Sequence, residues 1–208
     1  MADPRQDQSD LPSCLDQAVL DPLLTVEQLH ERCDAGRQER VRAICTSLRQ
    51  LPLLRERLGG QGGPKLIAAI GFPFGALPAE LRLAEATWAA AHGADELDVV
   101  PDFSALVEGD SSGFAEDLAA ITGLGLPVRV VLDMARLPED LLAIAVEASI
   151  DAGAAGVQSG NGFGPPCQAE QVAALSGLCS GRCAIQAAGG IHHPELAMDL
   201  LEAGAAPV

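Results

Sequence analysis

The sequence predicts an α/β fold, a (β/α)8 barrel of the TIM type whose eighth strand and helix are incomplete. Along the 208 residues, short apolar segments typical of strands buried on both faces alternate with longer helical segments. Three helical segments also end in a glycine followed by alanine, at Gly93, Gly153 and Gly204, just before a strand or the final stub. Seven such units followed by a stub at 205–208 fit a closed parallel barrel better than an open sheet.

The expected elements follow one another in chain order after a polar tail at 1–12, and residues 13–208 form a single domain. Thr25 and Gln28 have the spacing of a capping box that begins the first helix. Residues 102–113 are expected to be a loop. Strands are expected at 15–20, 41–45, 66–70, 96–100, 128–132, 154–158 and 183–187. Helices are expected at 25–35, 52–59, 78–91, 114–122, 138–151, 168–178 and 194–203.

The charge balance excludes two classes of partner. With 29 acidic and 13 basic residues the net charge is −16, whereas nucleic acids and anionic membranes bind clustered Lys and Arg. No run of 18 apolar residues is present, and the first ten residues are polar and acidic, so neither a membrane span nor a signal peptide is expected. We therefore expect a cytoplasmic protein.

The cysteines and histidines do not form a recognisable metal site. The six cysteines include no CxxC pair and are typical of reduced thiols in a cytoplasmic protein. Cys179 and Cys183 are four residues apart, but no nearby residues supply the remaining ligands of a zinc ion. His192 and His193 are adjacent, so their side chains tend to point in different directions. We expect neither a metal nor a cofactor.

One position draws attention to the carboxyl ends of the strands. Gln158 is a polar residue that ends the apolar strand at 154–158, immediately before a glycine-rich loop. In barrels of alternating strands and helices, the chemistry is built at these strand ends. Gln158 is therefore a candidate site residue.

Four segments, in this order along the chain, resemble the 2-deoxyribose-5-phosphate aldolase family. They are GFPFG at 71–75, GADELDVV at 93–100, SIDAGA at 149–154 and AAGGI at 187–191. Each alone is a weak signal, but their common order makes the resemblance specific, and it extends from about residue 15 to 205. The resemblance implies a barrel enzyme that works through a lysine Schiff base.

The resemblance assigns roles to two aspartates. Asp98 matches the family's acidic residue beside the reacting carbon, where a carboxylate can relay protons; alternatively it orients a loop at the strand end. Asp16 matches an acidic residue that helps hold the sugar hydroxyl; alternatively it caps the turn before Pro22. Cys45 aligns with a cysteine that the family often has, and burial of a small residue in a strand is sufficient to explain it.

Gln158 and Gln186 stand where the family has its Schiff-base lysine and a second lysine that lowers the pKa of the first. An amide nitrogen is delocalised and non-basic, so glutamine cannot attack a carbonyl. The single lysine of the chain, Lys65, comes just before the strand at 66–70 and is therefore expected at the opposite end of the barrel. Arg129 stays protonated and is no nucleophile. A Schiff-base aldolase cannot be built from these residues.

The resemblance also implies a phosphate site in the loops after the sixth and seventh strands. Gly162, Gly189 and Gly190 match family glycines whose backbone N–H groups approach the phosphate; alternatively they are ordinary loop glycines. The family's Gly-Ser-Ser segment after strand eight is absent, so phosphate binding is expected to be weaker. An incomplete eighth strand would also leave an open edge that favours a partner or a homo-oligomer.

Two functions follow from this combination. The first is a degenerate member of the family that forms no Schiff base and binds a small phosphorylated sugar or aldehyde, or serves as a regulatory or scaffold protein. The second is a working lyase, which cleaves 2-deoxyribose 5-phosphate to glyceraldehyde 3-phosphate and acetaldehyde, with Asp98 and a water molecule carrying out the proton chemistry.

Overall fold

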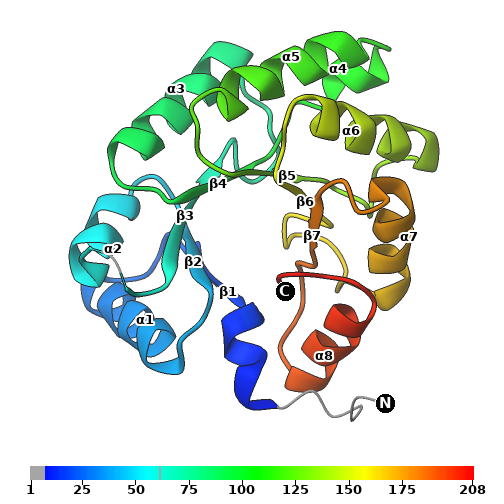
Figure 1. The fold of residues 1–208 in the computed structure, drawn as a ribbon. Helices are drawn as coiled ribbons and strands as arrows, with labels where there is room; N and C mark the ends of the chain where they lie inside the picture. Colours follow the sequence, from blue (N-terminus) through cyan, green and yellow to red (C-terminus); the bar gives the residue numbers. More distant parts are fainter. Residues whose placement is uncertain (1–7, 61) are drawn as a thin grey trace.

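Seven parallel strands form one curled sheet, with the helices outside it. The computed structural model describes residues 8–60 and 62–208. The strands pair in sequence order, each parallel to the next, and Figure 1 shows them at the centre of a ring of helices. The strands are β1 (Asp16–Val19), β2 (Ala43–Thr46), β3 (Lys65–Ile70), β4 (Glu96–Val99), β5 (Val128–Val131), β6 (Gly156–Gln158) and β7 (Ala184–Gln186).

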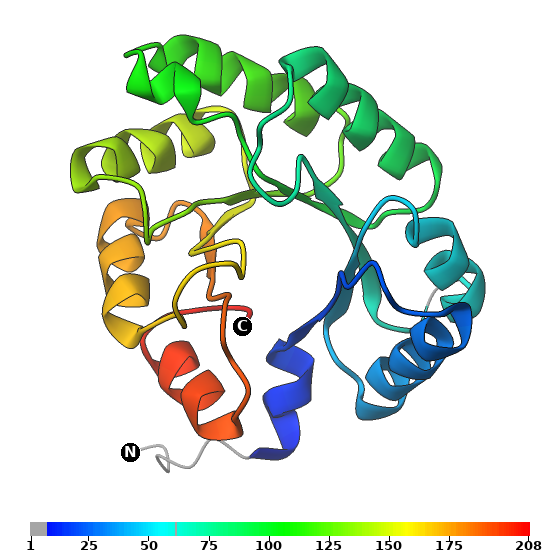
Figure 2. The same ribbon diagram turned by 180° about the vertical axis from the view of Figure 1, so that it is seen from behind.

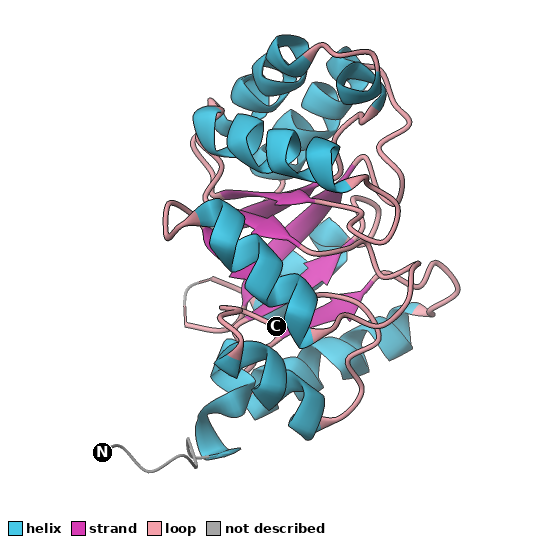
Figure 3. Ribbon diagram, turned by 90° about the vertical axis from the view of Figure 1, so that its right-hand side faces the viewer, coloured by secondary structure: helices cyan, strands magenta, loops and turns pink. Residues whose placement is uncertain are grey.

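The helices cover the outer face of the sheet. Figure 2 shows the same ring from behind, and Figure 3 shows the strands enclosed between helices on both sides. Within the described residues, no helix is both long and apolar enough to cross a membrane. The helices are η1 (Gln8–Cys14), α1 (Val26–Glu39), α2 (Leu51–Leu58), α3 (Ala79–Ala91), α4 (Ser104–Val107), α5 (Ser111–Thr122), α6 (Glu139–Asp151), α7 (Ala169–Cys179) and α8 (Pro194–Glu202).

The eighth position of the barrel is occupied by residues 205–208. The Ala206 N–H donates to the Ile185 carbonyl oxygen at 2.7 Å, on the β7 side. On the β1 side, the Val208 N–H donates to the Cys14 oxygen at 3.0 Å, and the Asp16 N–H donates to the Val208 oxygen at 2.8 Å. Figure 1 shows this segment, in red, between β7 and β1. The expected open edge is wrong over this stretch, because backbone hydrogen bonds of residues 205–208 reach both neighbouring strands, although these residues form no regular strand.

The local signals in the sequence form as predicted. The Gln28 N–H donates to the Thr25 hydroxyl at 3.2 Å, and the Thr25 N–H donates to the Gln28 side-chain oxygen at 2.9 Å, which completes the capping box of α1. Gly93, Gly153 and Gly204 have φ of 93°, 82° and 111°. Glycine adopts these values without the steric cost that other residues meet, so the chain can turn from helix to strand at each of the three positions.

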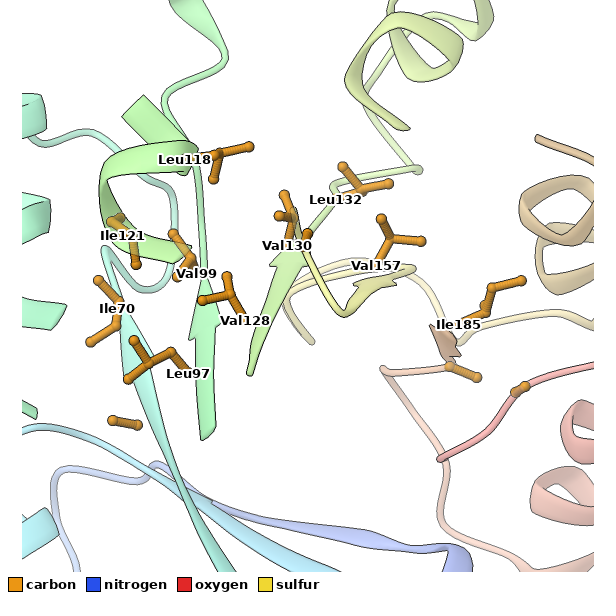
Figure 4. Packing of buried hydrophobic residues seen from close by; sticks show 14 of the residues in the cluster. Ile70, Leu97, Val99, Leu118, Ile121, Val128, Val130, Leu132, Val157 and Ile185 are labelled. Carbon is orange, nitrogen blue, oxygen red and sulfur yellow. The ribbon is translucent and has the colours of Figure 1, made fainter. Parts of the chain in front are cut away.

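The larger hydrophobic core lies between the sheet and the helices. Side chains from the outer face of the strands, such as Val99 and Val128, pack towards Leu118 and Ile121 of α5 (Figure 4). A second, smaller cluster, Ala43, Cys45, Ile67 and Ala69, comes from β2 and β3, with Phe72 and Leu20 packed against it. The barrel is therefore lined partly by small apolar side chains.

Two expectations for the secondary structure are wrong. Residues 8–12, expected in a polar tail, belong to η1, and Leu11 is buried in the core because it is the apolar residue of that segment; residues 1–7 lie outside the described residues. Residues 104–107, expected in a loop, form α4. The Asp102 carboxylate accepts hydrogen bonds from the N–H and the hydroxyl of Ser104, at 2.9 and 2.6 Å, and so orders the backbone at the first residue of this short helix.

Arg82 connects α3, α5 and the loop that follows β3. Its side chain is 1% exposed. Its guanidinium donates to the carbonyl oxygens of Gly75 and Leu77, at 3.0 and 2.7 Å, and pairs with Asp117 of α5. A buried guanidinium is tolerated here because its charge is paired and it meets two further acceptors.

We predict that Arg82→Met lowers the free energy of unfolding by about 3–5 kcal/mol, because it leaves the Asp117 carboxylate unpaired in a poorly hydrated place. Denaturant unfolding followed by circular dichroism measures this. The matched control is Arg136→Met, since the Arg136 side chain is 74% exposed and its ion pair with Asp133 contributes less than about 1 kcal/mol. Equal losses in the two variants would contradict the prediction.

Candidate active site

A buried ion pair network occupies the inside of the barrel. Arg129 of β5 donates to Asp98 of β4 at 2.8 Å and to Asp16 of β1 at 2.9 Å. Arg129 and Asp98 are 6% and 4% exposed. Alternation along each strand places these side chains on the inner face, opposite the side chains that pack against the helices.

The network continues towards the amino ends of the strands. Arg42, just before β2, donates to Asp16 at 2.6 Å and to Glu96 at 3.0 Å. Burial alone would lower the pKa of Arg42, but its hydrogen bonds to Asp16 and Glu96 outweigh this and raise it. For Glu96, burial would raise the pKa, and the hydrogen bonds from Arg42 and Lys65 outweigh it and lower the pKa.

Lys65 lies at the amino end of β3, as the sequence predicts. It is the first residue of this strand, and its ammonium group donates to Glu96, the first residue of β4, at 2.8 Å. Both residues are at the strand starts, whereas Gln158 and Gln186 are the last residues of their strands. The ammonium group is thus held at the end of the barrel opposite the two glutamines.

Gln158 and Gln186 are direct neighbours in the sheet. They are paired in the register of β6 and β7 and are 9% and 5% exposed. The Gln186 amide donates to Asp16 at 3.2 Å, which joins β7 to the ion pair network. The Gln158 amide donates to the Gly160 carbonyl oxygen at 2.7 Å, in the loop that follows. The sequence-predicted residues Asp16, Asp98 and Gln186 thus meet around Arg129, and Gln158 lies beside them.

Burial raises the pKa of Asp98 above its usual range, although the charge of Arg129 opposes this. The Cys45 thiol hydrogen bonds to this carboxylate, and burial raises the pKa of the thiol as well. Asp98 is thus held by Arg129, and its part in proton transfer stays a prediction. Cys45 is a buried thiol with a raised pKa rather than a reactive one. Asp16 does not cap the turn before Pro22 either: Asp21 does, since its carboxylate accepts from the Leu23 N–H at 2.9 Å.

The three glycines of the predicted phosphate site come from two adjacent loops. Gly162, Gly189 and Gly190 have φ of 83°, 111° and 68°. A Cβ on Gly190 would lie 2.7 Å from the Pro166 ring, so glycine is needed there for packing. A cavity of about 20 Å³ beside Gly162, also lined by Asp133, has room for about one water molecule. The phosphate role of these glycines stays a prediction.

An aromatic cluster joins the loops after β3 and β6. The Phe163 ring lies 5.8 Å from both the Phe72 and the Phe74 rings, and 66% of Phe163 is exposed. The Asn161 amide donates to the Pro73 carbonyl oxygen at 2.9 Å and so ties the two loops together. No role for these residues follows from the sequence, although GFPFG and NGF both carry phenylalanine next to glycine at strand ends.

The amino-terminal end of the barrel contains a larger cavity, of about 360 Å³. Its lining includes Arg42, Glu96 and Arg129, together with Cys14 and Pro207. This cavity lies below the ion pair network, away from the glutamines. A pocket of this size falls in the range of small-molecule sites, but its position differs from the strand ends where the resemblance places the chemistry.

The cysteines and histidines do not assemble a metal centre. Within residues 8–60 and 62–208, no group of three or more His, Cys, Asp or Glu side chains could hold a metal ion. Cys179 ends α7, and its hydrogen bond to Cys183 lowers the pKa of Cys183 to about 7, with a smaller contribution from the charge of Arg182. All six cysteines are free thiols.

Comparison with known proteins decides the family. No protein-family model matches the chain. The deoxyribose-phosphate aldolase of Rhodospirillum rubrum is 33% identical over 171 residues, which cover 80% of this chain and 71% of that protein. The deoxyribose-phosphate aldolase of Thermococcus gammatolerans is 32% identical over 202 residues, with 94% and 90% covered. The chain belongs to the deoxyribose-phosphate aldolase family.

Solved structures agree with this membership. The aldolase QR15 superposes with a TM-score of 0.90 at 28% identity, over 95% of this chain and 90% of that one. The tetrameric deoxyribose phosphate aldolase from Aeropyrum pernix gives a TM-score of 0.85 at 27% identity, with 97% and 86% covered. The family's barrel is therefore kept in this member, although glutamine occupies both positions where the resemblance places lysine.

The arginines that organise this aldolase-family barrel are not among the site residues expected from the sequence. From the sequence, Arg129 is only excluded as a nucleophile, and no role is expected for Arg42. The signal was available for Arg129, because a charged residue within the apolar strand VRVV must be paired with an opposite charge if it is buried. Its partners could not be named, because Asp16 is 113 residues away in the sequence.

We predict that Arg129→Met lowers the free energy of unfolding by about 3–5 kcal/mol at pH 7, since it leaves the Asp98 carboxylate buried without its partner. The folded-state pKa of Asp98 is already raised, and losing the cation raises it further. The variant is therefore destabilised as pH rises through that pKa, and it regains stability as the Asp98 carboxyl is protonated. Its loss of unfolding free energy relative to the unaltered protein should thus be smaller at pH 5 than at pH 7. Denaturant unfolding at both pH values measures it.

The double variant Arg129→Met with Asp98→Asn is the control. Without the Asp98 carboxylate, the loss should be smaller at pH 7 and should depend less on pH. A loss in Arg129→Met of the same size at pH 5 and pH 7 would contradict the assignment of the penalty to Asp98.

Proposed function

We propose that this member of the deoxyribose-phosphate aldolase family forms no Schiff base. The observation that carries the proposal is that Gln158 and Gln186, paired in adjacent strands, occupy both positions where the resemblance places lysine. Their amide nitrogens are delocalised and donate to Gly160 and Asp16. A non-basic nitrogen has no free lone pair with which to attack a carbonyl carbon.

Lys65 does not replace the missing amine. Its side chain starts at the amino end of β3 and is paired with Glu96. A strand of five or six residues is about 17–20 Å long, which is more than a lysine side chain can reach.

We further propose that the protein binds a small phosphorylated sugar or aldehyde, as the glycine loops suggest. The positive φ angles of Gly162, Gly189 and Gly190 leave their backbone without side chains at the carboxyl ends of β6 and β7. Such backbone can come close to a phosphate group. No cationic side chain lines the small cavity beside Gly162, and Asp133 does, so weak binding is the outcome that this charge pattern supports.

One observation favours the second candidate, a working lyase with an altered mechanism. Burial raises the pKa of Asp98, and a carboxyl group with a raised pKa is suited to general acid–base chemistry. In this reading Asp98 and a water molecule move the protons of a retro-aldol cleavage. Arg129 counts against it, since the charge-paired carboxylate is less able to take up a proton.

We propose that this chain forms a homo-oligomer in the cytoplasm. The relative from Aeropyrum pernix is described as tetrameric, which supports a homo-oligomeric state. The six cysteines are all unpaired, which supports a reducing, cytoplasmic environment. The net charge of −16 supports neither nucleic acid nor an anionic membrane as a partner.

Borohydride trapping with acetaldehyde tests for the Schiff base. We predict that intact mass and peptide mapping find ethyl groups only at the side chain of Lys65 and the amino terminus, as for any exposed amines. The Lys65→Arg variant is the matched control and should lose the first of these labels. Labelling inside the barrel would overturn the proposal.

A variant that should gain a borohydride-trapped label complements the trapping experiment. The variant Gln158→Lys with Gln186→Lys should be trapped at position 158, because it restores an amine beside a second cation that lowers its pKa. The second candidate would replace the first if three results were found together. The unaltered protein would release acetaldehyde from 2-deoxyribose 5-phosphate, it would give no trapped adduct, and Asp98→Asn would lose the activity.

For phosphate, we predict that millimolar inorganic phosphate raises the melting temperature of the protein by one or a few degrees, because a ligand bound only by the folded state stabilises it. Sulfate at equal ionic strength is the comparison for general salt effects. The variant Gly162→Ala should bind less, since the new side chain meets both a positive φ and the approach path. No shift with phosphate would end the claim of a phosphate site.

A further inference from the structure

Two free thiols are in contact where α7 ends and β7 begins. Cys179 is the last residue of α7, and Cys183 comes directly before β7. Their side chains are hydrogen-bonded to each other, and both belong to the core between the sheet and the helices. Side chains in contact already point towards each other, as the two halves of a disulfide must.

A tight turn brings the two cysteines together. The Arg182 N–H donates to the Cys179 carbonyl oxygen at 3.0 Å and so closes a turn over Ser180 and Gly181. These two residues have φ of 49° and 74°. Positive φ at both central residues is the signature of a type I′ turn. The chain therefore reverses directly after Cys179, and Cys183 comes to lie beside the end of the helix.

The two thiols differ in exposure, and this separates their roles. Cys179 is fully buried, whereas Cys183 is partly exposed. The hydrogen bond from Cys179 lowers the pKa of Cys183 to about 7, with a smaller contribution from the charge of Arg182. The same hydrogen bond, together with burial, raises the pKa of Cys179. Cys183 is therefore the thiol that can attack as a thiolate, while Cys179 keeps its proton until it is needed.

The pair is separate from the other features of the molecule. Within residues 8–60 and 62–208, no third His, Cys, Asp or Glu side chain joins it to hold a metal ion. It lies at the amino end of β7, whereas Gln186 ends that strand. Cys14 offers a comparison, since it is also partly exposed and its sulfur contacts the Ser13 hydroxyl at 4.0 Å.

We propose that Cys179 and Cys183 are a redox-active dithiol, which a small-molecule disulfide such as glutathione disulfide converts to an intramolecular disulfide. The inference does not depend on the proposed function, because neither cysteine belongs to the barrel interior. The new bond would join the end of α7 covalently to the start of β7, the strand that carries Gln186.

The exchange proceeds in two steps. The Cys183 thiolate attacks one sulfur atom of glutathione disulfide, so that one glutathione leaves as a thiolate and the other stays on Cys183 as a mixed disulfide. The Cys179 sulfur then attacks the Cys183 sulfur, its proton passes to a departing glutathione thiolate, and the second glutathione leaves. Two cysteine thiols are oxidised, and one glutathione disulfide is reduced to two thiols. An excess of a reducing dithiol reverses both steps.

Incubation with glutathione disulfide, followed by acid quenching, alkylation and mass spectrometry, tests the proposal. The unaltered protein should lose two of its six free thiols at the mass of a single chain, and peptide mapping should find Cys179 linked to Cys183. Dithiothreitol should restore both thiols. Circular dichroism checks that each protein is folded.

Two variants separate the roles of the cysteines. Cys179→Ser should keep one glutathione on Cys183, because the thiol that displaces it is gone. Cys183→Ser should leave Cys179 unmodified, because this buried thiol does not reach the oxidant by itself. The matched control is Cys14→Ser, which should form the same disulfide as the unaltered protein.

Three outcomes would overturn the inference. They are no reaction of either cysteine in the folded unaltered protein, glutathione retained on Cys183 of that protein without a disulfide to Cys179, or a disulfide that joins other cysteines. If Cys179→Ser does not fold, the unaltered protein and Cys183→Ser decide the question. None of these outcomes bears on the absence of a Schiff base, which borohydride trapping tests separately.

Discussion

Arg129 carries the charge on which the interior of this barrel depends. Its guanidinium reaches Asp98 on the neighbouring strand and Asp16 on β1 across the barrel, and Asp16 is shared with Arg42 and Gln186. A carboxylate in such a place is stable only while it is paired. Arg129 thereby links β5 to β1, which is far away in the sequence, in addition to the hydrogen bonds between neighbouring strands.

The same network shows how the charge of the barrel interior depends on having glutamine, and not lysine, at positions 158 and 186. Glutamine at 186 can donate to Asp16 without adding a charge, so the three carboxylates Asp16, Glu96 and Asp98 stay balanced by Arg42, Lys65 and Arg129. The polar interior is thus neutral as a whole. Imine chemistry, in contrast, needs an amine that can lose its proton.

The two ends of the barrel differ in character. The carboxyl ends hold Gln158 and Gln186, the loop glycines and the aromatic cluster of Phe72, Phe74 and Phe163. At the amino ends, the charges of Arg42 and Glu96 border a cavity of about 360 Å³. Lys65, at the amino end of β3, belongs to this second region, away from Gln158 and Gln186 at the carboxyl ends of β6 and β7.

The sequence by itself determined the order of strands and helices, the helix caps and the family, because these depend on local spacing and on short segments in a fixed order. It also determined that glutamine stands at positions 158 and 186. Only the tertiary structure decided that Asp16, Asp98 and Arg129 form one network, that Leu11 joins the core, and that residues 205–208 pair with both β7 and β1. These contacts join residues far apart in the chain, and their partners depend on strand register and on which face each side chain takes, which no local pattern specifies.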